Sequence, residues 1–205
     1  RQRIERYYGR QSTIILPPVD LDRFLVARSP DNYFLVVSAL VPYKRVDIVV
    51  EAFTRLGLPL RVVGDGPERA RLQKSAPDAH FLGFRHGEDY ARTLASADVL
   101  VFPSLTDTFG LVMLESMACG TPVAAYNAPS PLDVVENGIT GIIAGTLENA
   151  VERASALDRD RVAEGSRKFS WKTCADMFES WLVPCGFNPG REEDDGPFAR
   201  VAYSR

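Results

Sequence analysis

Short apolar runs alternate along the chain with longer stretches in which apolar residues recur at helical spacing. The runs are rich in β-branched and aromatic residues, as strands are. They are YFLVVS at 33–38, LRVV at 60–63, HFL at 80–82, VLVF at 99–102, PVAA at 122–125 and GII at 141–143. Strands that alternate with helices are typical of a doubly wound α/β fold. We therefore predict a parallel six-stranded sheet over residues 33–145, with helices on both faces.

The stretches between the runs carry the periodicity of helices. Val46, Val49 and Phe53 lie at i, i+3 and i+7, which places them on one helical face between the first two strands. Pro67 is tolerated in a first helical turn and is expected to open a helix at 68–74. Further helices are predicted at 88–95, 111–118, 147–157, 161–168 and 171–182.

The two ends of the chain differ from this pattern. Residues 1–24 combine a basic helical stretch (RQRIERYYGR) with PPVDLDRF and are interpreted as a linker, whereas 25–185 form the folded domain. Residues 186–205 contain an acidic run at 192–195 and few apolar side chains. Such a composition is typical of a flexible tail.

Composition narrows the class of protein. The chain has 205 residues, 45% of them hydrophobic, which is enough for one core. Its formal net charge of -3 gives no reason to expect a nucleic-acid partner. Cys119, Cys174 and Cys185 are odd in number and widely spaced, so we expect reduced thiols and neither a disulfide framework nor a metal site. No apolar stretch reaches the roughly 18 residues of a membrane helix, and we expect a cytoplasmic protein, at most peripheral at the inner membrane face.

Two common phosphate-binding motifs are missing. A dinucleotide fingerprint, G-x-G-x-x-G, should follow the first strand, but the chain reads ALVPYKR there. The later GDGPER has two of the three glycines and Arg69 at the third position. Nicotinamide cofactors are therefore disfavoured, and a Walker loop is absent.

Lys44 follows the first strand and lies just before a predicted helix. A cation is unfavourable at a helix N-terminus, and a phosphate bound at this turn would offset it. The alternative is an ordinary solvent-exposed lysine, and position alone does not decide between the two.

The segment TDTFGLVMLESMACGTPV holds two acidic residues, Glu115 within a predicted helix and Asp107 in the loop ahead of it. On a helical wheel Glu115 shares a face with Leu111, Leu114 and Ala118, so its carboxylate needs a partner. That partner could be a loop N–H group or the hydroxyls of a ribose. Asp107 precedes the helix at the carboxyl end of a strand, where open α/β sheets bind ligands.

Here the chain resembles the retaining glycosyltransferases of family 4, which have the GT-B fold. Asp107-x7-Glu115 is similar to their acidic-x7-Glu motif, whose first acid is usually Glu. The similarity runs in order from about residue 3 to 182, through ILPPVDLDRF, SALVPYKRVD, VVGDGPER, FLGF, ADVLVFPS and ACGTPV. Within the family, SALVPYKR and GDGPER look most like enzymes that move mannose onto lipopolysaccharide or related glycans.

The resemblance implies one Rossmann-like half of a GT-B fold that binds a GDP- or UDP-linked sugar without a cofactor or metal. It assigns catalytic roles to Lys44, at the diphosphate, and Asp107, at the sugar hydroxyls. The other implied substrate contacts are Thr108, Phe109, Gly110 and Leu111 at the sugar and phosphate, Glu115 at the ribose, and Phe84 and Arg85 near the nucleobase. Positive charge develops on the sugar and negative charge on the departing diphosphate, which Lys44 and backbone amides would stabilise.

The chain departs from the family in two places. Ala39 stands where members usually have an Arg that pairs with the diphosphate, and the loop after Ala125 reads YNAPSPLD where glycines are common. We further expect the acceptor-binding N-terminal domain to be missing from this chain, with a lipid or glycan as acceptor. The alternative is a truncated or degenerate nucleotide-sugar-binding module without transferase activity. His80 is expected to pack within its strand and His86 to be solvated, neither acting as a base.

Overall fold

The computed structural model describes residues 2–24, 26 and 30–182, and the tail predicted at 186–205 lies outside this part. Its six strands are β1 (Phe34–Val37), β2 (Leu60–Val63), β3 (His80–Gly83), β4 (Val99–Phe102), β5 (Val123–Tyr126) and β6 (Gly141–Ala144). They form one sheet in the order β3-β2-β1-β4-β5-β6, and every neighbouring pair is parallel. The predicted parallel six-stranded sheet is confirmed.

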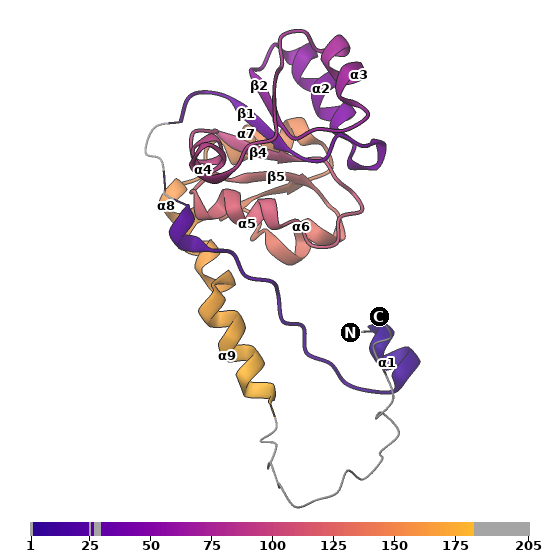
Figure 1. Cartoon of the computed structure of the whole chain (residues 1–205), viewed down its shortest axis with the longest axis vertical. Coiled ribbons are helices and arrows are strands. Elements are labelled where there is room, and N and C mark those ends of the chain that lie inside the picture. The colour runs from indigo at the N-terminus through magenta and orange to yellow at the C-terminus, as the bar shows by residue number, and fades with distance from the viewer. Residues whose placement is uncertain (1, 25, 27–29, 183–205) are drawn as a thin grey trace, which may run out of the picture.

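Helices cover the sheet on both faces (Figure 1). In chain order they are α1 (Gln2–Tyr8), α2 (Val46–Leu56), α3 (Arg69–Ser75), α4 (Gly87–Ala95), α5 (Leu111–Ala118), α6 (Pro129–Val134), α7 (Leu147–Ala154), α8 (Arg159–Ser166) and α9 (Trp171–Trp181). Single 3-10 turns occupy Leu21–Arg23, Pro42–Lys44 and Arg167–Phe169. Helices α2, α3 and α7 bury their apolar residues on one face, and α4, α5, α6 and α8 on the other.

The strands supply apolar side chains to both cores. In β1, Leu35 and Val37 point to the side of α4 and α5, whereas Val36 packs against α2. Each fully buried Val or Leu of this kind contributes about 1.5–3 kcal/mol to the free energy of unfolding. Because both faces are covered, the strands read as nearly continuous apolar runs, which is why the sequence located them within about a residue.

Several helices differ from their predicted extent, and α7 ends at Ala154 and not at 157. α8 starts at Arg159 and not at 161, because the Asp158 carboxylate caps it by accepting from the N–H groups of Asp160 and Arg161 at 2.9 and 3.0 Å. α3 starts at Arg69, after Pro67 has turned the chain. α6 was not predicted, since its sequence PSPLDV lacks helical periodicity, but Pro129 at its start has the φ angle that a first turn requires.

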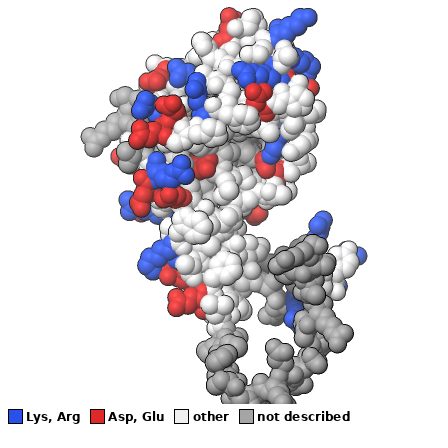
Figure 2. All heavy atoms as spheres, viewed as in Figure 1, with Lys and Arg blue, Asp and Glu red and all other residues white. Residues whose placement is uncertain are grey.

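The charged side chains of the sheet domain are mixed in sign. Figure 2 shows Lys and Arg next to Asp and Glu across the face in view, without a continuous patch of either sign. His80 is exposed at the edge of the sheet, so the expectation that it packs in a strand was wrong. β3 is the outermost strand, which leaves one of its sides unpaired.

Candidate functional site

A cavity of about 530 Å³ opens at the carboxyl ends of β1 and β4. Its walls come from three segments: the end of β1 with the residues after it (37–39 and Lys44), the chain that runs from β4 into α5 (102–104 and 107–112), and Pro17 of the N-terminal segment. From β1 the chain proceeds outward to β2 and β3, and from β4 it proceeds the other way to β5 and β6. The cavity therefore lies where the strand order reverses, the position at which open α/β sheets bind ligands.

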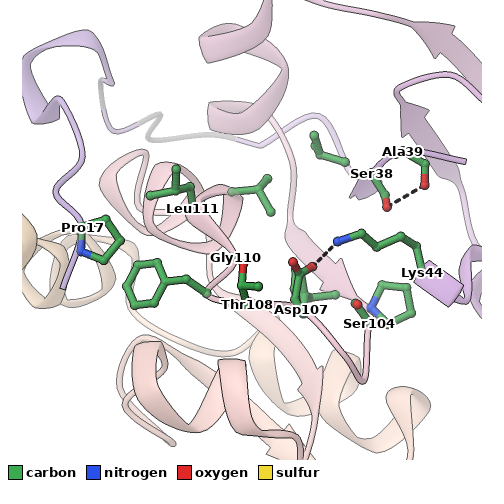
Figure 3. A pocket seen from close by; sticks show the side chains of 14 residues that line it. Pro17, Ser38, Ala39, Lys44, Ser104, Asp107, Thr108, Gly110 and Leu111 are labelled. Atoms are coloured by element: carbon green, nitrogen blue, oxygen red, sulfur yellow. Dashed lines mark hydrogen bonds and ion pairs between the residues drawn. The ribbon is translucent and has the colours of Figure 1, made fainter. Parts of the chain in front are cut away.

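An ion pair spans this cavity. The Lys44 ammonium, in the 3-10 turn after β1, lies 2.5 Å from a carboxylate oxygen of Asp107, in the loop after β4 (Figure 3). Each side chain is only 17% exposed. Lys44 is therefore not the solvated lysine of the alternative interpretation, and two residues 63 positions apart meet across the reversal point.

The first turn of α5 forms another wall, and Gly110 determines its path. Gly110 has φ 84° and ψ 60°, and a Cβ atom there would lie 2.6 Å from the Met113 side chain and 3.1 Å from the Phe102 ring. Only glycine fits such a site without strain. The Ser130 hydroxyl donates to the Phe109 carbonyl at 2.5 Å, which holds the peptide between Phe109 and Gly110 in place. The first N–H groups of a helix have no partner within it, so this wall offers a positive backbone end to a ligand.

The GDGPER segment, which fails as a dinucleotide fingerprint, supports the opposite wall. A Cβ atom on Gly64 would lie 1.9 Å from the Ser38 carbonyl oxygen, and one on Gly66 would lie 2.4 Å from that of Leu40. The loop after β2 can therefore lie directly against the loop after β1, and the Leu40 N–H donates to the Asp65 carbonyl at 2.9 Å. The Gly66 N–H and the Arg69 guanidinium hold the pKa of the Asp65 carboxyl below its usual range.

Glu115 is held by a residue that sequence reasoning did not find. The Tyr90 hydroxyl, from α4, donates to one oxygen of its carboxylate at 2.5 Å, a partner that adds to the loop N–H group or ribose considered above. Tyr90 has no distinguishing sequence signal, since the contact depends on how α4 packs beside α5. The predicted shared face of α5 needs a correction: Leu114 and Ala118 are buried, but Leu111 is 48% exposed and lines the cavity.

Burial raises the pKa of the Tyr90 hydroxyl well above its ordinary value, and the charge of Glu115 raises it further. A group with a raised folded-state pKa contributes stability that is present below its unfolded pKa, about 10 for tyrosine, and is lost as the pH rises beyond it. We expect Tyr90→Phe to remove part of the fall in the free energy of unfolding above pH ~10. Denaturant melts between about pH 9 and 11 measure this slope. Tyr8→Phe, at an exposed site, should leave it as in the wild type; an unchanged slope in Tyr90→Phe would contradict the assignment.

The remaining predicted contacts do not line the cavity. Phe84 and Arg85 follow β3 at the same edge of the sheet, and both are exposed. Phe84 stacks on His86 with ring centroids 6.3 Å apart. Glu115 is also absent from the cavity wall, whereas Lys44, Asp107 and the predicted stretch 108–111 all contribute to it.

The described residues contain neither a metal centre nor a membrane helix. Within 2–24, 26 and 30–182, no three His, Cys, Asp or Glu side chains are grouped so that they could hold a metal ion. No helix in this part of the chain is both long and apolar enough to cross a bilayer.

The chain resembles known glycosyltransferases in sequence. It is 35% identical over 164 residues to a GDP-mannose-dependent alpha-mannosyltransferase of Mycobacterium tuberculosis, a match that covers 77% of this chain and 42% of the relative. It is 30% identical to a D-inositol 3-phosphate glycosyltransferase of Geodermatophilus obscurus, over 86% of this chain and 48% of that one. The chain thus spans less than half the length of these relatives.

Solved structures and a family model agree with this result. A lipopolysaccharide outer core galactosyltransferase in its apo form superposes with a TM-score of 0.71 at 18% identity, over 82% of this chain and 54% of the other. The Anabaena protein HepE, in complex with UDP, does so with 0.69 at 22% identity, over 82% and 56%. These two structures have the fold described above. The family model described as glycosyl transferases group 1 matches residues 20–161, and the chain belongs to this family.

Proposed function

We propose that the chain is the donor-binding domain of a retaining glycosyltransferase. The whole protein would move a hexose, with mannose favoured, from a nucleoside diphosphate sugar to a glycan or a membrane-surface lipid. The observation that carries this proposal is the meeting of Lys44 and Asp107 in the cavity at the strand reversal, beside the first turn of α5. A cation, a carboxylate and free helical N–H groups are the partners that a diphosphate sugar needs.

Each group has a separate task in this proposal. Lys44 and the backbone at Phe109, Gly110 and Leu111 bind the diphosphate and stabilise the charge that it gains as it departs. Asp107 and Thr108 contact the sugar.

The nucleoside would extend along the same edge of the sheet. Glu115 binds the ribose with the carboxylate oxygen that Tyr90 does not occupy, and Phe84 with Arg85 contacts the base. The exposed aromatic face of Phe84 at that edge supports this direction.

The choice of donor follows from the relatives. The mycobacterial relative is named for GDP-mannose, whereas HepE was solved with UDP. Calorimetric titration with GDP-mannose, UDP-glucose, UDP-GlcNAc and the free nucleotides tests the proposal directly. We expect GDP-mannose to bind most tightly, with a dissociation constant of order 0.1–1 mM. Failure of every nucleotide and nucleotide sugar to bind would refute the donor-binding role.

Ala39 lines the cavity at a position where members of the family usually have Arg, so the cavity has one positive charge fewer. Because Ala39 is exposed at the cavity wall, an Arg side chain there can reach a bound diphosphate. Ala39→Arg should tighten the binding of a nucleoside diphosphate about tenfold, and more strongly at low salt. Titrations at two salt concentrations measure the effect. Ala39→Gln, which adds length without charge, is the control, and equal affinities of the two variants would count against an electrostatic role.

An acceptor-binding domain is the partner that this proposal requires, and α9 supplies a surface for it. Trp171, Phe178 and Trp181 are 65%, 57% and 64% exposed, and their spacing places them on one side of the helix. Exposed apolar surface of this kind favours association. We expect the chain alone to self-associate at micromolar concentration, and Phe178→Glu to reduce this in sedimentation velocity. A monomeric wild type would contradict the expectation.

Ala39 also favours the second candidate, a degenerate binding module without transferase activity. Both candidates bind the donor, so a transfer assay on the whole protein distinguishes them. Incubation of the whole protein with radiolabelled GDP-mannose and bacterial lipid extract should give a labelled glycolipid if it is a transferase. The 205-residue chain alone should give none, because the proposal assigns the acceptor site to the acceptor-binding domain.

A further inference from the structure

One buried hydroxyl lines the cavity without a hydrogen-bond partner. Ser104 follows β4 and Pro103, is 2% exposed, and forms part of the cavity wall. Its hydroxyl oxygen is the one buried side-chain N or O atom in the described residues for which no hydrogen bond is formed. Figure 3 shows Ser104 among the side chains that line the cavity, close to Asp107 in this view.

The other buried serine and threonine hydroxyls of the described chain show how unusual this is. Each of them has a partner: Ser116 donates to the Thr121 carbonyl, Thr121 to that of Leu94, Ser130 to that of Phe109, Ser166 to that of Ala163, and Thr140 accepts from the Glu136 N–H. Buried polar groups are nearly always paired in folded proteins, because an unpaired one costs stability. The one exception among the described residues, Ser104, belongs to the cavity wall.

The neighbours of Ser104 explain which ligand group it can serve. Lys44 and Asp107 are engaged with each other, and Ala39 brings no further cation to the wall. A serine hydroxyl can donate one hydrogen bond and accept others. It therefore suits an oxygen-bearing group, either a phosphoryl oxygen or a sugar hydroxyl.

We infer that the Ser104 hydroxyl is a direct contact to the nucleotide-sugar donor, donating a hydrogen bond to an oxygen of its diphosphate or its hexose. The inference rests on the proposed function of the cavity. On this inference, the hydroxyl has no hydrogen-bond partner within the protein and gains one from the donor on binding, so its hydrogen bond contributes to affinity.

Ser104→Ala tests this, with Ser38→Ala as the matched control. Ser38 lines the same cavity, but its hydroxyl already donates to the Ala39 carbonyl at 3.0 Å. Three probes are titrated by calorimetry: inorganic diphosphate, GDP and GDP-mannose. We expect Ser104→Ala to lose about tenfold in affinity and Ser38→Ala less than about twofold. A loss already present with inorganic diphosphate identifies a phosphoryl contact, and one that appears only with GDP-mannose identifies a sugar contact.

Thermal unfolding separates this role from a structural one. Without ligand, Ser104→Ala should melt at or above the wild-type temperature, because the substitution breaks no hydrogen bond within the protein. The increase in melting temperature on adding GDP-mannose should become smaller. Ser104→Cys, which keeps a similar volume but is a poor donor, should show the same loss of affinity.

The outcomes also separate the inference from the function on which it rests. If the wild type binds GDP-mannose and Lys44→Ala weakens it, while Ser104→Ala and Ser104→Cys bind all probes as tightly as the wild type, Ser104 is not a contact. If the wild type binds none of the probes, the donor-binding function fails and this inference fails with it.

Discussion

Lys44→Ala should weaken the binding of GDP-mannose and of GDP by about 1.5–3 kcal/mol, because one charged hydrogen-bonding partner is lost. The substitution has two effects in the same direction. It removes the ammonium proposed to bind the diphosphate, and it leaves the Asp107 carboxylate, 17% exposed, without its cation. An uncompensated carboxylate in the cavity repels a dianionic ligand. Isothermal titration at low and high salt measures the change, which should shrink as salt increases.

Two further variants make this test specific. Lys172→Ala also removes a lysine from an ion pair, at 2.6 Å from Asp176, but on α9 and away from the cavity; it should not change the affinity. Asp107→Asn frees Lys44 from its carboxylate. It should bind the nucleotide at least as tightly as the wild type, yet lose affinity for the nucleotide sugar, since the proposed sugar contact is gone. If Lys44→Ala bound the nucleotide as tightly as the wild type, Lys44 would not be a ligand contact, and the proposed site would lose its main support.

Gly64→Ala should lower the free energy of unfolding by more than about 3 kcal/mol, at the upper end of what single substitutions cost. The new methyl group would lie 1.9 Å from the Ser38 carbonyl oxygen, which belongs to backbone that cannot easily move. The backbone of Gly64 also has φ 123°, which side chains disfavour. Urea denaturation measures the loss.

Gly57→Ala is the matched control for this prediction. Gly57 also has a positive φ, 64°, at the C-terminus of α2, but a Cβ there meets nothing within 4 Å. Its replacement should cost only about 1 kcal/mol, the strain of the left-handed conformation alone. Similar losses in the two variants would show that contact between the two loops does not matter. A Gly64→Ala protein that still folds should also bind nucleotide less tightly, because Ser38 and Ala39 line the cavity.

The sheet could be predicted from sequence because each strand is buried on both faces and each helix has one apolar side. Boundaries set by local chemistry were harder, as the Asp158 cap and the proline-rich α6 show. Lys44 and Asp107 were placed at the right edge of the sheet by their positions after strands, whereas the cavity wall at 108–111 was expected from the family resemblance. Their direct ion pair was not predicted, because their separation along the chain hides it.

Contacts that depend on packing between helices were beyond the sequence. Tyr90 reaches Glu115 because α4 lies beside α5 on one face of the sheet, and no pattern in either helix records this. Ser104 is a similar case. Whether a hydroxyl lacks a partner depends on the side chains packed around it in the folded protein. The local sequence FPS gives only the two residues before Ser104 and does not predict those neighbours.

The sheet is weakest in pairing where the cavity lies. Strands β1 and β4 share two Cα partner pairs, Phe34 with Val99 and Leu35 with Leu100, whereas β1 and β2 share four. This seam joins segments far apart in the chain, so we expect it to close late in folding, after the loop between them has been ordered. A ligand held by groups on both sides of the seam binds only the closed form and increases its population by mass action. The concentration of the donor in the cell would then help to determine the fraction of molecules in which the two halves of the sheet are paired. The rate at which a protease cleaves the open form would fall accordingly.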